Sequence, residues 1–359
     1  MRAVPTNLRR LARPAAILLA GAGMAAAARA LRRRPPIQFR DRVAVVTGGS
    51  RGLGLLMARE LAAEGARLAI LARDPAELDL ARRELAAISG YRVLAVPCDV
   101  GDREEVRWAI DTVAGRFGRL DILINNAGTI QVGPLEHMRV EDFEEALRVH
   151  FWGPLYATLA ALRHLRQQPT ARIVNIASIG GRIVIPHLLP YSASKFALVG
   201  LSDGLRAELA KEGIYVTTVC PGLMRTGSHV NARFKGKREE ELAWFAVGGA
   251  LPPSSMSGRR AARRILEACR YGEPSLILTP QARAAAALSA LAPNLTARVM
   301  ELAARLLPGP AGNDGDEARP GWQHTSRWVP SALTRLVDEA AVENNELQGR
   351  AAAYGNGGG

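Results

Sequence analysis

The sequence predicts an α/β protein with a doubly wound parallel sheet of about seven strands in a single main domain. Short apolar runs alternate with amphipathic stretches from residue 39 to residue 280. This alternation is typical of βαβ units, in which helices cover both faces of a parallel sheet. The chain has 359 residues, of which 48% are hydrophobic and 23% charged. That is enough for one large core with flanking segments, and it excludes a disordered or collagen-like chain.

The expected strands are continuous runs rich in β-branched residues or leucine, as in strands buried on both faces. They lie at residues 43–47, 68–71, 93–96, 121–124, 172–176, 214–219 and 275–279. The expected helices have apolar residues at a helical period. They lie at about residues 53–64, 75–88, 102–117, 141–166, 192–212 and 258–271. Strands and helices thus alternate along the chain in the manner of a Rossmann-type sheet.

An arginine-rich segment, residues 1–38, precedes the main domain. It contains an apolar run of 14 residues at 15–28 between arginines. Because a spanning helix needs about 17–25 residues, the run is expected to be a marginal anchor, an interfacial helix or a signal peptide. We predict that residues 1–38 associate with a membrane surface, since clustered arginines flank an apolar helix.

The segment after the main domain, residues 281–359, is expected to be a helical extension with a flexible tail. Residues 281–307 are rich in alanine, leucine and arginine, which indicates an amphipathic helix. Residues 308–320 combine proline, glycine and acidic residues, and residues 355–359 are rich in glycine. We expect the former to be a linker and the latter a loose terminus.

The net charge of +13 is concentrated at the N-terminus. Residues 1–40 contain nine arginines and no acidic residue, so the rest of the chain carries only +4. We therefore expect no nucleic-acid partner, because a nucleic-acid-binding domain would carry its basic surface on the fold itself. The three cysteines, Cys98, Cys220 and Cys269, are widely spaced and form no CxxC pair. This spacing predicts a reduced compartment and no metal site.

A glycine-rich segment joins the first expected strand to the first expected helix. Backbone N–H groups at the start of a helix bind phosphate, and glycines allow a phosphate to approach the backbone closely. At this place in a βαβ unit, the segment predicts a dinucleotide site rather than a plain turn. Its candidate binding residues are Thr47, Gly48, Ser50, Arg51, Gly52, Leu53 and Gly54.

The end of the second strand usually decides which dinucleotide is bound, because an acidic side chain there binds the ribose hydroxyl. Here the strand ends in Ala72, which has no carboxylate. Arg51 and Arg73 are placed to face a 2′-phosphate, and the planar guanidinium suits that task. Asp74 either caps the helix that follows or serves the ribose. We predict NADP(H) as the preferred cofactor, with NAD(H) as the alternative.

A tyrosine and a lysine lie four residues apart at the start of the fifth expected helix. Tyr191 and Lys195 therefore share one face of that helix. A free tyrosine has a pKa near 10, and an adjacent ammonium group stabilises its phenolate. Ser178 ends the fifth strand, and its hydroxyl is placed to donate to a substrate oxygen while Tyr191 exchanges the proton.

Together these motifs resemble the short-chain dehydrogenase/reductase superfamily, in its single-domain form, over about residues 40–280. The matching segments are TGGSRGLG at 47–54, CDV at 98–100, NNAG at 125–128, Ser178, YSASK at 191–195 and PG at 221–222. The resemblance implies an NAD(P)-dependent oxidoreductase that interconverts a carbonyl and a secondary alcohol. We predict a cytoplasmic homo-oligomer, a dimer or a tetramer, acting on an apolar small molecule.

The resemblance also implies further cofactor contacts. Two residues after the third strand would border the adenine, and Lys195 would bind the nicotinamide ribose. Residues after the fourth strand would support the sheet and the cofactor, and residues after the sixth would lie beside the nicotinamide. These residues are Asp99, Val100, Asn126, Ala127, Gly128, Pro221, Gly222 and Thr226.

One position departs from the family pattern. His150 stands where the family usually has an asparagine in the fourth helix. Histidine also donates and accepts hydrogen bonds, so we assign it to the catalytic group as a water-linked relay that titrates near pH 6.5. The alternatives are a structural histidine at a helix interface and, for the whole protein, a non-catalytic redox sensor with an altered site.

Residues 222–257 stand where the family carries its substrate lid. Four apolar residues there are candidates for lining a substrate pocket, namely Phe234, Trp244, Phe245 and Val247. Four basic residues either meet an acidic group or lie on a solvated, mobile loop, namely Arg233, Lys235, Lys237 and Arg238. By resemblance, His187, Leu188 and Leu189 face the same region.

Overall fold

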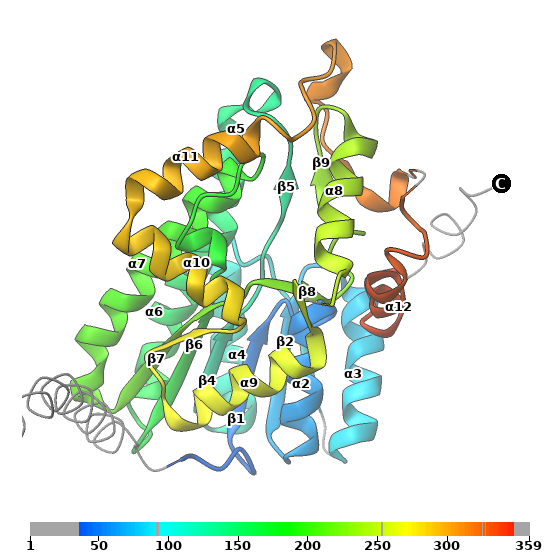
Figure 1. Cartoon of the computed structure of the whole chain (residues 1–359). Coiled ribbons are helices and arrows are strands. Elements are labelled where there is room, and N and C mark those ends of the chain that lie inside the picture. Colours follow the sequence, from blue (N-terminus) through cyan, green and yellow to red (C-terminus); the bar gives the residue numbers. More distant parts are fainter. Residues whose placement is uncertain (1–35, 91–92, 253, 325, 327, 348–359) are drawn as a thin grey trace, which may run out of the picture. The chain divides into compact units, whose positions relative to one another are not determined.

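The structure is a computed structural model that describes residues 36–90, 93–252, 254–324, 326 and 328–347. The described residues from Gln38 onward form one compact unit (Figure 1). The apolar run at 15–28 lies outside the described residues. Within the described part of the chain, no helix combines the length and hydropathy needed to cross a membrane.

A seven-stranded sheet forms the centre of this unit (Figure 1). Its strands are β1 (Val43–Thr47), β2 (Arg67–Ala72), β3 (Leu94–Pro97), β4 (Ile122–Asn125), β6 (Ala171–Ile176), β7 (Ile214–Cys220) and β11 (Ser275–Ile277). They lie in the order β11-β7-β6-β4-β1-β2-β3, and every pairing is parallel. This confirms the predicted fold class and all seven strands. The winding reverses between β1 and β4, where ligands bind in such sheets.

Helices cover both faces of the sheet. The helix α2 (Gly52–Ala63) packs against α3 (Pro75–Ser89) and against α9 (Gly258–Tyr271). The helices α4 (Arg103–Phe117) and α6 (Gly153–Leu165) pack together, and α7 (Leu189–Leu209) packs against α5 (Val140–Leu147). A large buried cluster joins α4 and α6 to the central strands, for example through Ile110, Ala161 and Leu123.

The helix predicted at 141–166 is interrupted. A wider, π-helical turn at Arg148–Trp152 separates α5 from α6. Pro154 provides the physical reason, because it lacks an N–H group and its ring collides with the carbonyl one turn earlier, so the helix cannot continue with regular bonding. His150 lies on this turn, and such turns are frequent at functional sites.

The region between β7 and α9 is ordered structure. It contains β8 (Leu223–Arg225), β9 (Arg233–Phe234), α8 (Arg238–Ala250) and β10 (Ser255–Ser257). β8 pairs with β10 in parallel, and β9 pairs with β5 (Gln131–Val132). Short 3-10 turns complete the fold, at Leu135–His137, Ile179–Gly181, Ala210–Glu212, Asn313–Asp316 and Gly321–Gln323.

The C-terminal extension differs from its prediction in two respects. The single helix expected at 281–307 is divided at Pro293 into α10 (Pro280–Leu291) and α11 (Pro293–Ala304). The linker expected at 308–320 is wrong, because β12 (Arg319–Pro320) pairs antiparallel with β9. The chain then continues into α12 (Arg335–Glu343), which lies beside α8.

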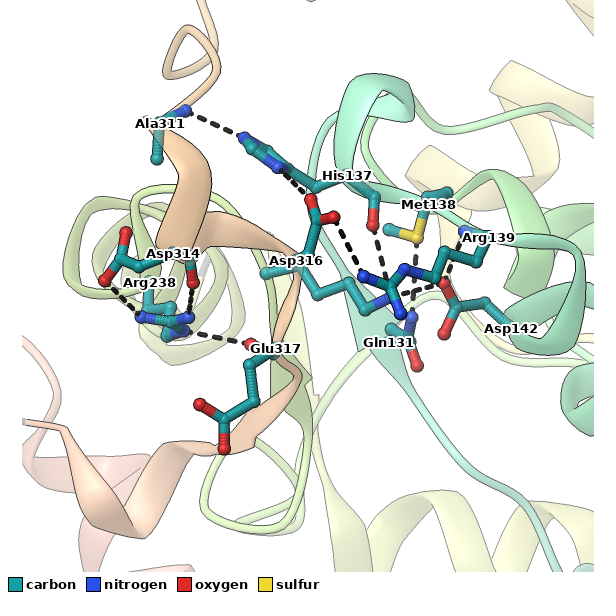
Figure 2. A network of polar contacts seen from close by, with 11 residues as sticks. Gln131, His137, Met138, Arg139, Asp142, Arg238, Ala311, Asp314, Asp316 and Glu317 are labelled. Atoms are coloured by element: carbon teal, nitrogen blue, oxygen red, sulfur yellow. Dashed lines mark hydrogen bonds and ion pairs between the residues drawn. The ribbon is translucent and has the colours of Figure 1, made fainter.

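Polar side chains hold residues 311–317 against the body of the protein (Figure 2). Nδ1 of His137 lies 2.8 Å from Oδ1 of Asp316, and Nε2 of His137 accepts the backbone N–H of Ala311 at 2.9 Å. Arg139 donates to the other oxygen of Asp316 at 3.0 Å. Arg238 donates to the backbone carbonyl of Glu317 at 3.0 Å. Two of the acidic residues that suggested a linker, Asp314 and Asp316, are thus paired with basic residues distant in sequence, whereas the Glu317 carboxylate pairs with Arg319.

Candidate active site

A cavity of about 470 Å³ opens at the carboxyl ends of the central strands. It brings together most of the residues predicted from the sequence. The predicted residues that line it are Gly48, Ser50, Arg51, Gly52, Leu53, Arg73, Asp99, Val100, Asn126, Ala127, Gly128, His150, Ser178, Tyr191, Lys195, Pro221, Gly222 and Thr226. Thr47 and Gly54 are buried in the loop behind this lining.

The glycine loop has a backbone conformation that favours glycine. Gly48 and Gly52 have φ values of 63° and 57°, in the left-handed region. A Cβ atom on Gly54 would lie 2.0 Å from the carbonyl oxygen of Gly48. The side chain of Arg51, at the N-cap of α2, makes no capping hydrogen bond, so the start of α2 faces the cavity without a side-chain cap. The loop therefore has the shape and the polarity that a phosphate requires.

Thr47 and Asn126 connect the glycine loop to the end of β4. The hydroxyl oxygen of Thr47 accepts the backbone N–H groups of Asn126 at 2.9 Å and Ala127 at 3.0 Å. The Asn126 amide donates to the carbonyl oxygens of Thr47 at 3.0 Å and Gly48 at 3.2 Å. These two residues hold the loop in position.

An acidic side chain that the sequence analysis missed lies at the adenosine end of the cavity. Glu77, in the first turn of α3, accepts a hydrogen bond from Arg51 at 2.8 Å and one from Ser50 at 3.2 Å. Asp74 caps α3 through the N–H groups of Ala76 and Glu77, which settles one of its two predicted roles. The only signal for Glu77 was its place in the first turn of the helix after β2.

Asp99 and Val100 form a neighbouring wall of the cavity. The Asp99 carboxylate accepts hydrogen bonds from Arg148 and from the Gly101 N–H, each at 2.9 Å. Although burial opposes ionisation, these partners hold the pKa of Asp99 below its ordinary value. Asp99 therefore stays ionised at neutral pH and fixes the loop after β3.

Tyr191 and Lys195 lie one turn apart at the start of α7, as predicted. The Lys195 ammonium donates to the carbonyl oxygen of Ile176 at 2.9 Å and lies 5.6 Å from the centre of the Tyr191 ring. Burial lowers the pKa of Lys195 to about 7. Burial also raises the pKa of Tyr191, and a hydrogen bond with Ser178 opposes that rise. The three predicted catalytic groups thus meet at one place.

His150 is buried behind Tyr191, with both ring nitrogens bonded. Nε2 accepts the Thr129 N–H at 3.1 Å, so the hydrogen of the neutral ring is on Nδ1, which donates to Ser194 Oγ at 2.8 Å. Ser194 Oγ in turn donates to the carbonyl oxygen of Tyr191 at 2.8 Å. Burial, with the nearby Lys195 cation, lowers the pKa of His150 well below 6.5. The expected titration near pH 6.5 is therefore not supported.

An apolar cavity of about 130 Å³ adjoins Tyr191 and Ser178. Of the four apolar residues predicted for a substrate pocket, Phe245 lines it, whereas Phe234 lies in a buried core cluster. Trp244 and Val247 line a separate surface hollow. The remaining apolar lining includes Ile130, Ile185, Leu188, Met224 and Val337.

Of the four basic residues of this region, Arg233 and Lys237 are exposed, whereas Lys235 and Arg238 bond to distant parts of the chain. Lys235 is buried and pairs with Asp142 at 2.5 Å, and Arg238 bonds to the segment around Asp314. None of the four predicted basic residues lines the apolar cavity. No cluster of three or more metal-ligating side chains occurs in the described ranges, and the three cysteines there are buried thiols.

Comparison with known proteins agrees with this geometry. Residues 42–236 match the family model for short chain dehydrogenases. The chain belongs to the short-chain dehydrogenase/reductase family. It is an NAD(P)-dependent oxidoreductase of that family, acting on CH–OH groups.

Its relatives extend beyond the matched region. The oxidoreductase YxnA of Bacillus subtilis is 34% identical over 325 residues, which cover 85% of this chain and 88% of the relative. An Anopheles gambiae dehydrogenase/reductase SDR family protein 7-like is 32% identical over 272 residues, covering 74% and 84%. The crystal structure of L-sorbose reductase from Gluconobacter frateurii, complexed with NADPH and L-sorbose, matches with a TM-score of 0.61 and 26% identity, covering 67% of this chain and 97% of that one.

Proposed function

We propose that the protein is an NADP(H)-dependent ketoreductase that interconverts a carbonyl and a secondary alcohol on an apolar small molecule. The observation that carries the proposal is the meeting of Ser178, Tyr191 and Lys195 at one end of a cavity whose other end is the glycine loop. A bound nicotinamide cofactor supplies or accepts the hydride. The protein's own residues bind, orient and exchange the proton.

Tyr191 is the proton donor in reduction and the acceptor in oxidation. Burial raises its pKa, so the phenol stays protonated at neutral pH and is ready to donate to a substrate oxygen. Ser178 bonds to the same tyrosine and is placed to hold that oxygen by a second hydrogen bond. Lys195, when protonated, stabilises the phenolate left after donation.

The preference for NADP(H) rests on Arg51 and Arg73, which line the adenosine end of the cavity, and on the absence of a carboxylate at Ala72. A structural relative, L-sorbose reductase, is complexed with NADPH. Because Glu77 already holds Arg51, a 2′-phosphate must share or take over this guanidinium. NAD(H) therefore remains the alternative cofactor, with Glu77 serving the ribose hydroxyls.

An apolar substrate is favoured by the lining of the cavity beside Tyr191. Ile185, Leu188, Met224 and Phe245 present hydrocarbon surface next to the catalytic hydroxyl groups. A substrate with a carbonyl group on an apolar body would match both the catalytic hydroxyl groups and the hydrocarbon lining. The non-catalytic alternative is disfavoured because Ser178, Tyr191 and Lys195 are all retained in the lining of one cavity.

Screening tests this proposal. Purified protein should oxidise NADPH in the presence of apolar ketones or aldehydes, and faster than it oxidises NADH. A panel ranging from small polar to bulky apolar carbonyls identifies the substrate class. Absence of turnover with every member, for protein that binds NADPH, would favour the redox sensor instead.

Residues 1–38 are proposed to hold the protein at the cytoplasmic face of a membrane, because nine arginines at residues 1–40 surround the apolar run at 15–28. We also propose a homo-oligomer, a dimer or a tetramer. Membrane fractionation tests the membrane association, and sedimentation of detergent-free protein tests the oligomeric state.

A further inference from the structure

The C-terminal turn at residues 344–347 contacts the glycine loop at the phosphate end of the cofactor cavity. The Gly52 N–H donates to the carbonyl oxygen of Asn344 at 2.8 Å. A Cβ atom on Gly52 would lie 2.5 Å from Oε1 of Glu346, so this carboxylate sits directly on the loop. Glu346 is also part of the cavity lining. A residue almost 300 positions away thus covers the start of α2.

The Glu346 carboxylate bridges the two sides of the cavity. Its Oε2 lies 3.4 Å from Nε of Arg51, on the glycine loop, and accepts the Asn231 amide at 2.6 Å. The backbone carbonyl of Glu346 accepts the same amide at 2.8 Å. Glu346 is only 6% exposed. Burial raises its pKa, while Arg51 and Asn231 oppose that rise.

Arg51 therefore faces two carboxylates. Glu77 bonds to its Nη1 and Glu346 lies near its Nε. A dinucleotide bound at this loop brings its phosphates to the same guanidinium and to the same end of α2. Three anionic groups at one guanidinium repel one another, so one of the carboxylates must withdraw or lose its charge.

We propose that Glu346 competes with the cofactor's phosphates for Arg51, and that residues 344–347 are a cover which the dinucleotide displaces as it binds. Glu346 is accordingly a residue that sets cofactor affinity without taking part in proton transfer. The inference rests on the proposed function only in taking a dinucleotide as the ligand. It requires no substrate and no turnover.

The turn is bonded to the end of α12, because the Glu346 N–H donates to the carbonyl oxygen of Ala341 at 2.9 Å. Helix α12 ends at Glu343, whose carbonyl oxygen accepts a hydrogen bond from Arg59 at 2.8 Å. Nε2 of His229 and Oδ1 of Asp338, which are 3.1 Å apart, join the body of that helix to the domain. Further upstream, the network of Figure 2 fixes residues 311–317. Displacement of 344–347 therefore breaks the bonds of the turn with α12 and Thr226, while these upstream contacts still hold the extension.

The test compares two isosteric variants of the full chain. Glu346→Gln removes the charge but keeps an acceptor for Asn231, so folding should be preserved. Glu343→Gln is the matched control, because that side chain is exposed and pairs with Arg259, away from the cavity. By isothermal titration calorimetry, Glu346→Gln should bind NADPH at least about tenfold more tightly than the wild type, as expected for loss of a charged competitor. Glu343→Gln should match the wild type.

Hydrogen exchange in the wild type supplies the second measurement. NADPH should accelerate backbone exchange in residues 344–347 and slow it in the glycine loop. If Glu346→Gln binds NADPH no more tightly than the wild type, or if NADPH slows exchange in the turn, the proposal that residues 344–347 are a displaceable cover is overturned. Failure of all variants to bind either dinucleotide overturns both the cover and the proposed function. If the variants bind NADPH in the predicted ratios to the wild type but no carbonyl is turned over, only the proposed function is overturned.

Discussion

His150 should position the catalytic tyrosine without titrating during turnover. Its ring joins the Thr129 backbone, after β4, to Ser194 on α7, and Ser194 bonds to the Tyr191 carbonyl oxygen. The relevant perturbations are His150→Leu, which removes both bonds, and His150→Asn, whose shorter side chain reaches one of them. The same asparagine substitution at His164, outside the cavity on α6, is the control.

The structure sets the size of the effect. His150→Leu leaves the Thr129 N–H without an acceptor and the Ser194 oxygen without a donor, each costing about 1–3 kcal/mol when buried. We expect a loss of about 2–4 kcal/mol in the free energy of unfolding, and about half of that for His150→Asn. A small displacement of Tyr191 should lower kcat about tenfold to a hundredfold, with the Kd for NADPH nearly unchanged.

The pH dependence separates this role from a titrating relay. Folded protein holds the pKa of His150 well below 6.5, whereas the unfolded chain protonates near 6.5. The neutral ring thus contributes stability above pH 6.5 that is lost as the pH falls toward the folded pKa, and His150→Leu should lack this component. Thermal unfolding and kcat, measured on the same preparations from pH 5 to 9, test both statements. An acidic limb of kcat near pH 6.5 that disappears in His150→Asn would refute the positioning role.

Other predictions concern the cofactor, the direction of the reaction and the N-terminus. Arg73→Ala should weaken NADPH binding about tenfold and leave NADH nearly unaffected, whereas Glu77→Gln should increase the preference for NADPH; equal affinities in the wild type would contradict both. Because burial lowers the pKa of Lys195 to about 7 and only its protonated form stabilises the Tyr191 phenolate, reduction should slow as the pH rises from 6 to 8. Alcohol oxidation should accelerate with pH because it requires the Tyr191 phenolate, whose pKa burial raises, and initial rates in both directions check both statements. Deleting residues 1–38 should release the protein from anionic vesicles and spare activity, which flotation assays measure; a full-length protein that does not float fails the prediction.

Much of the fold and the catalytic group was predictable because the signals are local. Strands buried on both faces require continuous apolar runs, so all seven were found from residue type alone. The four-residue spacing of Tyr191 and Lys195 places them on one face of a helix. The glycine loop is recognisable from its place after β1. The break at Pro154 was also readable in principle, since proline cannot continue a helix with regular bonding.

The missed features depend on contacts between distant segments. Glu346 meets Gly52 only because the extension folds back along the domain, and no local pattern marks it. Asp316 resembled a linker residue until its pairing with His137 was seen. Lys235 resembled a solvated charge, yet it is buried against Asp142. Charged side chains are exposed on average, but a charged side chain that pairs with a buried partner is itself buried.

The central claim is that Tyr191 transfers the proton in an NADP(H)-dependent carbonyl reduction. The most direct test is the single-turnover rate of NADPH oxidation by wild type and Tyr191→Phe, with the best carbonyl from the panel and with NADPH affinity measured on the same samples. Tyr191→Phe should bind NADPH normally and lose several orders of magnitude in rate, since the hydroxyl is needed only in the transition state. A variant that retains a substantial fraction of the wild-type rate would contradict the assignment.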